Sequence, residues 1–226
     1  MNPAVSSGVL PCVEVETGAD PRASIIWLHG LGADGHDFEP AVPALVPAGA
    51  PALRFVFPHA PVRPVTLNGG ARMRAWYDIL SFERDAPPDE RGIRASDAAV
   101  RALIARENQR GIATERIVLA GFSQGGALAL FTGTRLAQRL AGIIGLSCYL
   151  LLPESFAHER TAANQATPIF LAHGTLDTIV PLQLGEQAQM LLSQHAYAVE
   201  WHAYPMAHAV CAQELAAIAT FLRRLA

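Results

Sequence analysis

Short and almost continuously apolar runs recur along the chain, and most of them are rich in Val, Ile, Leu and Phe. Such runs are typical of strands that are buried on both faces, as in a parallel sheet covered by helices. They predict strands at residues 24–30 (SIIWLHG), 53–58 (LRFVFP), 117–122 (IVLAGF), 142–147 (GIIGLS), 168–174 (PIFLAHG) and 197–204 (YAVEWHAY).

Helical patterns lie between these runs, at residues 92–111, 127–140, 181–195 and 208–225. The alternation predicts an α/β fold, a mostly parallel sheet flanked by helices. Because the 226 residues hold no long linker, repeat or charged block, we expect a single domain over residues 1–226. The one long irregular stretch, 59–91, surrounds an aromatic segment, MRAWYDILSF, and a loop of that length usually has a function.

Composition removes several classes of function. The formal net charge of -3 offers no basic surface for nucleic acid and no polybasic segment for an anionic membrane. The first twenty residues lack the features of a secretory signal, and the longest apolar run, 140–152, is too short to span a bilayer. We therefore expect a cytoplasmic protein with no stable membrane insertion.

Cysteine and lysine usage narrows the chemistry further. The three cysteines, Cys12, Cys148 and Cys211, are scattered and lack metal-ligand spacing, so we expect reduced thiols and no metal site. All 17 basic residues are arginine, which excludes a Schiff-base lysine, a P-loop lysine and a Ser-Lys catalytic pair. The chemistry that remains requires no organic cofactor.

Residues 117–126, IVLAGFSQGG, combine a predicted strand, a tight turn and the start of a predicted helix. In that context Gly121-x-Ser123-x-Gly125 is the pattern of a strained turn that exposes a serine hydroxyl above the edge of a sheet. An ordinary glycine-rich turn is the alternative. The flanking strand and helix favour Ser123 as a nucleophile, and without lysine its base is expected to be a histidine.

Active sites of parallel sheets lie beyond the carboxyl ends of the strands, so a catalytic histidine should directly follow a strand. Four of the eight histidines do so: His29, His59, His173 and His208. His29 and His173 each precede a glycine and are expected to hold loops together by hydrogen bonds. His208, in YPMAHAV after the last strand, is the predicted general base.

An imidazole that accepts a proton needs a carboxylate on its other nitrogen. HGTLDTIVP places Asp177 on a loop after a strand, whereas Asp78 lies in the aromatic segment and Asp97 in a helix. The order Ser123, Asp177, His208 is that of α/β-hydrolases.

The oxyanion hole of such a site requires backbone N–H groups. One is expected from Gln124, directly after the nucleophile, and the other from Leu31, in the flexible turn WLHGLGADGHDF after an early strand.

Seven segments resemble, in order, the phospholipase/carboxylesterase family of small α/β-hydrolases, which includes bacterial carboxylesterases and acyl-protein thioesterases. They are HGLGADGHDF (29–38), WYDI (76–79), RGI with a following serine (91–96), GFSQGG (121–126), LSCYL (146–150), HGTLDTIVP (173–181) and MAH (206–208). The resemblance implies the same triad and oxyanion residues, an acyl-binding cleft edged by Trp76, and no large lid domain. Two departures are Ala207, where the family usually has glycine, and Cys148, where a smaller residue is commoner.

The expected activity is that of a serine carboxylesterase, which hydrolyses short to medium acyl esters through an acyl-enzyme. An apolar cleft edged by Trp76, Leu31, Leu80 and Phe82 suits an ester or lipid-like small molecule. An acyl-protein thioesterase or lysophospholipase is the alternative, since both react through the same intermediate. A non-catalytic binding protein on a hydrolase scaffold is a remote alternative, and apolar residues at the cleft rim would serve a homodimer as readily as a lipid tail.

Overall fold

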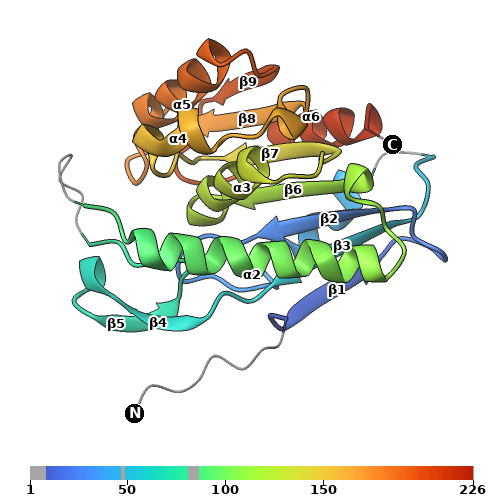
Figure 1. Cartoon of the computed structure of the whole chain (residues 1–226), viewed down its shortest axis with the longest axis horizontal. Helices are drawn as coiled ribbons and strands as arrows, with labels where there is room; N and C mark the ends of the chain where they lie inside the picture. The colour runs from blue at the N-terminus through green and yellow to red at the C-terminus, as the bar shows by residue number, and fades with distance from the viewer. Residues whose placement is uncertain (1–8, 47–48, 81–86, 226) are drawn as a thin grey trace.

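A computed structural model describes residues 9–46, 49–80 and 87–225 and contains a seven-stranded, mostly parallel sheet between two layers of helices (Figure 1). The strands of the sheet are β1 (Cys12–Glu16), β2 (Ala23–Leu28), β3 (Leu53–Pro58), β6 (Ile117–Phe122), β7 (Gly142–Leu146), β8 (Ile169–Gly174) and β9 (Val199–Tyr204). Each strand predicted from an apolar run is present, with ends that differ by at most two residues.

The sheet order is β1-β3-β2-β6-β7-β8-β9. All neighbouring pairs are parallel except β1 with β3, where Val13 lies opposite Phe57 in antiparallel register. The prediction omitted β1 because its sequence, CVEVE, alternates with glutamate and lies at the sheet edge, where one face is solvated. The carboxyl ends of β2, β6, β8 and β9 therefore lie along one edge of the sheet.

Alternate residues of each strand enter two separate cores. On one face, Ile26 and Leu28 pack against α2 (Glu90–Gln109) and α3 (Gln124–Arg135), and this core extends to α4 (Pro153–Glu159) and α5 (Leu182–Gln194). On the other face, Ile25 and Trp27 belong to a core with α1 (Val42–Leu45) and α6 (Ala212–Arg223). The helices thus cover both faces, as the continuous apolar runs require.

The irregular tract contains a short antiparallel hairpin that the sequence analysis did not predict, β4 (Val62–Val65) and β5 (Ala71–Arg74). Apart from the buried Val65, the residues of its strands are exposed or half-buried, and arginine and proline interrupt their sequence, so they lack the apolar run that marks the other strands. Among the described residues, no helix combines the length and the hydrophobicity that crossing a membrane requires.

Candidate active site

Ser123 stands on the turn between β6 and α3, with φ of 53° and ψ of -120°. Positive φ is rare for a residue with a side chain and indicates a backbone held by its surroundings. The flanking glycines explain how the backbone of Ser123 is held in this conformation. A Cβ on Gly121 would lie 2.3 Å from the carbonyl carbon of Gly125, and one on Gly125 would lie 2.3 Å from the Leu28 oxygen. Strand and helix therefore meet at a separation that only glycine permits.

His208 reaches Ser123 from the loop after β9. Its Nε2 lies 2.9 Å from the Ser123 Oγ, and its Nδ1 lies 2.6 Å from the Asp177 Oδ2. The structure thus brings together the three side chains predicted as nucleophile, base and acid, although Ser123 and Asp177 precede His208 by 85 and 31 residues along the chain. In this arrangement Nδ1 donates to the carboxylate, which leaves Nε2 as the acceptor for the serine proton.

The Asp177 carboxylate is fully buried and is held on its second oxygen. Oδ1 accepts hydrogen bonds from the Ile179 and Val180 N–H groups, each at 2.9 Å. His173 Nε2 lies 3.5 Å from Oδ2 and 2.8 Å from the Val180 carbonyl oxygen. These contacts hold the carboxylate with Oδ2 toward His208, where it accepts the hydrogen bond from Nδ1.

A close backbone contact sets the position of the histidine loop. A Cβ on Gly174 would lie 2.3 Å from the Met206 oxygen and 2.5 Å from the Ala207 oxygen. The Phe122 ring packs against the His208 imidazole, with centroids 4.7 Å apart. Ala207 does not have positive φ, so alanine is compatible with the loop at a position where glycine is usual in the resembling family.

The two predicted oxyanion donors lie on adjacent turns. Gln124 is the first residue of α3, and Leu31 follows β2 in a turn in which Gly32 has φ of 80° and donates to the Arg74 oxygen at 2.9 Å. Within the described part of the chain, neither the Leu31 nor the Gln124 backbone N–H donates a hydrogen bond to a protein atom. A Cβ on Gly30 would meet the Ser123 Cβ at 3.5 Å, so this turn passes beside the serine.

Trp76 differs from its predicted place at the edge of a cleft, because its side chain is fully buried. Its indole Nε1 donates to the His29 oxygen at 2.9 Å, and its backbone N–H donates to the Gln124 Oε1 at 2.8 Å. The Gln124 Nε2 in turn donates to the Tyr77 oxygen at 2.8 Å. The indole thus ties the aromatic segment to the turn after β2, while the Trp76 backbone ties it to the nucleophile turn, and the ring does not face solvent.

The structural role of the Gln124 side chain could not be inferred from the sequence. Only the position of its backbone N–H could be inferred from the nucleophile turn. The amide ties the aromatic segment to the turn at residues 48 and 47 positions away, and no local pattern indicates such contacts.

The other residues predicted to edge the cleft are Leu31, Leu80 and Phe82. Leu80 is 41% exposed and Leu31 is half-buried, whereas Phe82 falls outside the described residues. Two exposed side chains that the prediction omitted, Leu176 and Ile179, flank Asp177 and are 63% and 58% exposed. These residues could have been identified from the sequence, since exposed apolar residues beside the predicted catalytic carboxylate suit contact with an apolar ligand.

The competing histidines and carboxylates have structural partners. The His29 Nδ1 lies 2.7 Å from the Gly30 oxygen and its Nε2 accepts from the Ala60 N–H at 3.1 Å, while burial lowers the pKa of this imidazole. Asp78 accepts from the Thr66 N–H, and Asp97 pairs with a neighbouring arginine on α2. These contacts match the loop-tying role predicted for His29.

Cys148, which lies beside the nucleophile turn, has a packing role in this site. Cys148 is buried against the nucleophile turn, where its Sγ would lie 3.1 Å from a Cβ on Gly126, and burial raises the pKa of the thiol. It fills space that the glycines leave open. Among the described residues, His, Cys, Asp and Glu side chains form no group of three or more suited to holding a metal ion.

Comparisons with known proteins find matches that cover nearly the whole chain. A family model described as Phospholipase/Carboxylesterase matches residues 10–226. The chain is 42% identical over 221 residues to acyl-protein thioesterase 1 of Neurospora crassa, covering 94% of this chain and 90% of that protein.

Two solved structures have the same fold. Arabidopsis thaliana SOBER1 has a TM-score of 0.83 at 33% identity and covers 90% of this chain and 99% of its own. Zea mays acyl-protein thioesterase 2 has a TM-score of 0.82 at 26% identity and covers 95% and 98%. The likeness therefore extends over nearly the whole of each protein.

Proposed function

The chain belongs to the phospholipase/carboxylesterase family of α/β-hydrolases and is a serine hydrolase, and from that premise we propose that Ser123, His208 and Asp177 are its catalytic triad. The observation that carries the proposal is the continuous hydrogen-bonded relay from the serine hydroxyl through the imidazole to a buried carboxylate. The constrained Ser123 backbone supports it, since a strained turn after a strand is how this fold presents a nucleophile.

The reaction follows from the positions of the donors and acceptors. His208 takes the Ser123 proton as Oγ attacks the acyl carbonyl carbon, and the Leu31 and Gln124 N–H groups stabilise the oxyanion that forms. His208 then protonates the leaving alcohol or thiol as the acyl-enzyme forms. Water, deprotonated by the same imidazole, attacks the acyl-enzyme and releases the acid while Ser123 regains its proton.

For the substrate, we propose acyl thioesters of the kind carried by S-acylated proteins, rather than short esters as first expected. The reason is that relatives at 36–42% identity are named acyl-protein thioesterases. The exposed apolar side chains of Leu176 and Ile179, on the loop that carries Asp177, support an acyl chain lying beside the triad, and exposed Leu80 is a further candidate contact. The carboxylesterase hypothesis stays as the second candidate, because an oxygen ester reacts through the same intermediate.

The residues of the triad are tested by Ser123→Ala. We expect turnover of a p-nitrophenyl ester to fall by roughly 10³-fold or more and labelling by a fluorophosphonate probe to disappear. Ser193→Ala, an exposed serine on α5, is the control and should retain both. Undiminished labelling of the Ser123→Ala protein would contradict the assignment and favour another nucleophile.

The substrate class is tested separately with an S-acyl peptide and its O-acyl counterpart of the same chain length. We expect a higher kcat/KM for the thioester. If the oxygen ester is hydrolysed faster across the acyl series, the carboxylesterase hypothesis replaces the thioesterase one while the triad assignment stands.

Three further expectations, on the domain, the location and the oligomeric state, also remain proposals. Residues 1–226 form one α/β-hydrolase domain, which the single seven-stranded sheet supports. A cytoplasmic location and a homodimer are further proposals, and sedimentation at several protein concentrations tests the dimer.

A further inference from the structure

A cavity of about 520 Å³ lies at the edge of the sheet opposite Ser123. Four of its lining residues are arginines. They lie near the amino ends of β2, β3 and β6, either at the start of a strand or in the loop that leads to it. The lining consists of Asp20, Pro21, Arg22, Arg54, Arg110, Gly111, Ile112 and Arg116. The proposed acyl hydrolysis uses none of these residues.

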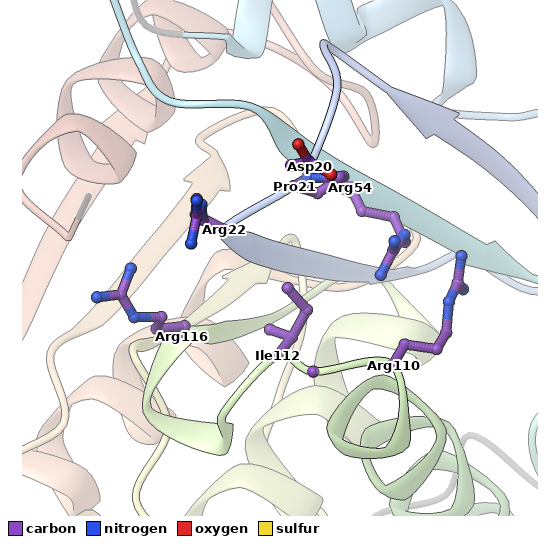
Figure 2. Close-up of a pocket in the computed structure, with 8 residues that line it drawn as sticks. Asp20, Pro21, Arg22, Arg54, Arg110, Ile112 and Arg116 are labelled. Carbon is purple, nitrogen blue, oxygen red and sulfur yellow. The ribbon is translucent and has the colours of Figure 1, made fainter.

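The four arginines divide into two pairs. Figure 2 shows Arg22 and Arg116 at one end of the cavity and Arg54 and Arg110 at the other, with Ile112 between them. Like charges gathered in one cavity repel each other unless an anion neutralises them. The net charge that remains at each end, after the ion pairs within the protein, therefore indicates which chemical group of a ligand that end would bind.

The end with Arg54 and Arg110 is neutralised within the protein. Arg54 Nε lies 2.8 Å from Glu16 and its Nη1 lies 3.0 Å from the buried Glu107. Arg110 Nη1 lies 2.9 Å from Glu107 and 2.9 Å from Glu14. This network fixes both guanidinium groups and offers a mixture of N–H donors and carboxylate acceptors, which suits hydroxyl groups.

The end with Arg22 and Arg116 keeps its charge. Both side chains are exposed, and neither has a carboxylate within 4.0 Å among residues 9–46, 49–80 and 87–225. Asp20 is the one acidic residue in the lining. Two guanidinium groups, each with a planar fork of N–H donors, match the oxygens of a phosphate group.

The backbone around the cavity is fixed before any ligand binds. The carbonyl groups that end α2 accept hydrogen bonds from the Arg110, Gly111 and Ile112 N–H groups. The Asn108 Nδ2 donates to the Ile112 oxygen at 2.8 Å. On the opposite wall, the Arg22 N–H donates to the Ala52 oxygen at 2.8 Å. A preformed cavity loses less entropy on binding than a loop that must become ordered.

We propose that this cavity binds a small organic phosphate with hydroxyl groups, in the class of sugar phosphates. The phosphate lies between Arg22 and Arg116, the organic part lies over Ile112, and its hydroxyl groups meet the Arg54 and Arg110 network. The volume is within the range of small-molecule sites.

The test is isothermal titration calorimetry, in which glucose 6-phosphate is added to the full chain at constant ionic strength. We expect saturable binding that is at least tenfold tighter than that of inorganic phosphate, and no binding of glucose. In Arg22→Ala/Arg116→Ala the affinity for glucose 6-phosphate should fall at least tenfold, with folding checked by circular dichroism.

The matched control is Arg72→Ala/Arg223→Ala, which removes the same charge from two exposed positions outside the cavity. It should bind glucose 6-phosphate as the unchanged chain does. No saturable binding of glucose 6-phosphate, equal affinity for inorganic phosphate, or an equal loss in the control variant would each overturn the proposal.

Discussion

At the scale of single residues, Asp177 determines which nitrogen of His208 carries the proton. The 2.6 Å contact at Nδ1 and two backbone donors on the other carboxylate oxygen leave Nε2 unprotonated and directed at Ser123. An amide in the same place can donate to Nδ1, which favours the opposite tautomer and a protonated Nε2 that cannot accept the serine proton.

We therefore expect Asp177→Asn to fold and to lose turnover by roughly 10⁴-fold, since the shape of the side chain is kept and the acceptor is not. The measurement is kcat on a chromogenic ester, beside the thermal midpoint. Asp97→Asn, on α2 away from the site, is the control. If both variants turned over at a similar rate, the imidazole would not depend on this carboxylate.

Glu214, in the first turn of α6, is a buried acid without a neutralising partner. Its exposed fraction is 0%, and neither oxygen meets hydrogen-bonding geometry with a described residue. Burial outweighs the nearby Cys211 backbone N–H and raises the pKa of the carboxyl group to about 7. The folded protein thus keeps Glu214 protonated at a pH where the unfolded chain has already released the proton.

The sign of the pH effect follows. Between pH 4.5 and about 7 the folded state binds more protons than the unfolded state, so this group's contribution to stability is present below that window and is lost as pH rises through it. The loss amounts to about 3 kcal/mol at most. In Glu214→Gln the decline of the unfolding free energy across the window should flatten.

Urea unfolding at several pH values gives the slope, which is independent of any constant cost of the amide. Glu154→Gln, an exposed acid in the first turn of α4, should leave the slope as it is. A slope that persists in Glu214→Gln would assign the titration to another group.

At the scale of elements, the nucleophile turn depends on how closely α3 approaches β2. A Cβ on Gly125 would lie 2.3 Å from the Leu28 oxygen and 2.5 Å from the His29 oxygen, and backbone atoms cannot rotate away as a side chain does. We expect Gly125→Ala to shift α3, to lower the unfolding free energy by about 3 kcal/mol and to reduce turnover.

Gly69→Ala is the control that separates the effect of the close approach at Gly125 from the free-energy cost of replacing any glycine. Gly69 has φ of 65° but open space around its Cβ, so its replacement should cost only about 1 kcal/mol and leave turnover unchanged. Chemical denaturation and ester hydrolysis of the two variants give the comparison. Equal effects would mean that the close approach is relaxed by movement of the turn.

The elements show which features were readable from the sequence. The parallel strands were predicted because each is a continuous apolar run, and Ser123, Asp177 and His208 were placed together because strand ends share one edge of the sheet. β1 and the β4–β5 hairpin were not predicted, since their exposed faces break the run. The burial of Trp76 was not predictable, because contacts with His29 and Gln124, nearly fifty residues away, produce it.

At the scale of the whole molecule, a buried carboxylate on α2 joins the helix layer to three strands. Glu107 accepts from Ser24 of β2 at 2.6 Å and from Arg54 of β3 at 3.0 Å, and Arg110 extends the contact to Glu14 of β1. These donors lower the pKa of Glu107 despite the opposing effect of burial.

We expect Glu107→Gln to lower the unfolding free energy by about 3 kcal/mol at pH 7, because two arginines lose a charged partner inside the protein. The lowered pKa means that this stabilisation is present above pH 4.5 and is lost as pH falls through the folded-state value. The difference between the unchanged and variant proteins should therefore shrink at pH 3. Denaturant titrations at the two pH values measure it, with exposed Glu115→Gln as the control, and a difference that is constant with pH would contradict the assigned cause.

The separation of the three side chains along the chain has a consequence for synthesis. The ribosome makes the serine turn first, the carboxylate loop some fifty residues later and the imidazole loop last, after β9. A nascent or truncated chain that has already formed the strained turn after β6 therefore has the proposed nucleophile but not the proposed base. During refolding, hydrolysis would begin only when the final strand docks on the sheet. The onset of activity would therefore measure the rate of this last folding step.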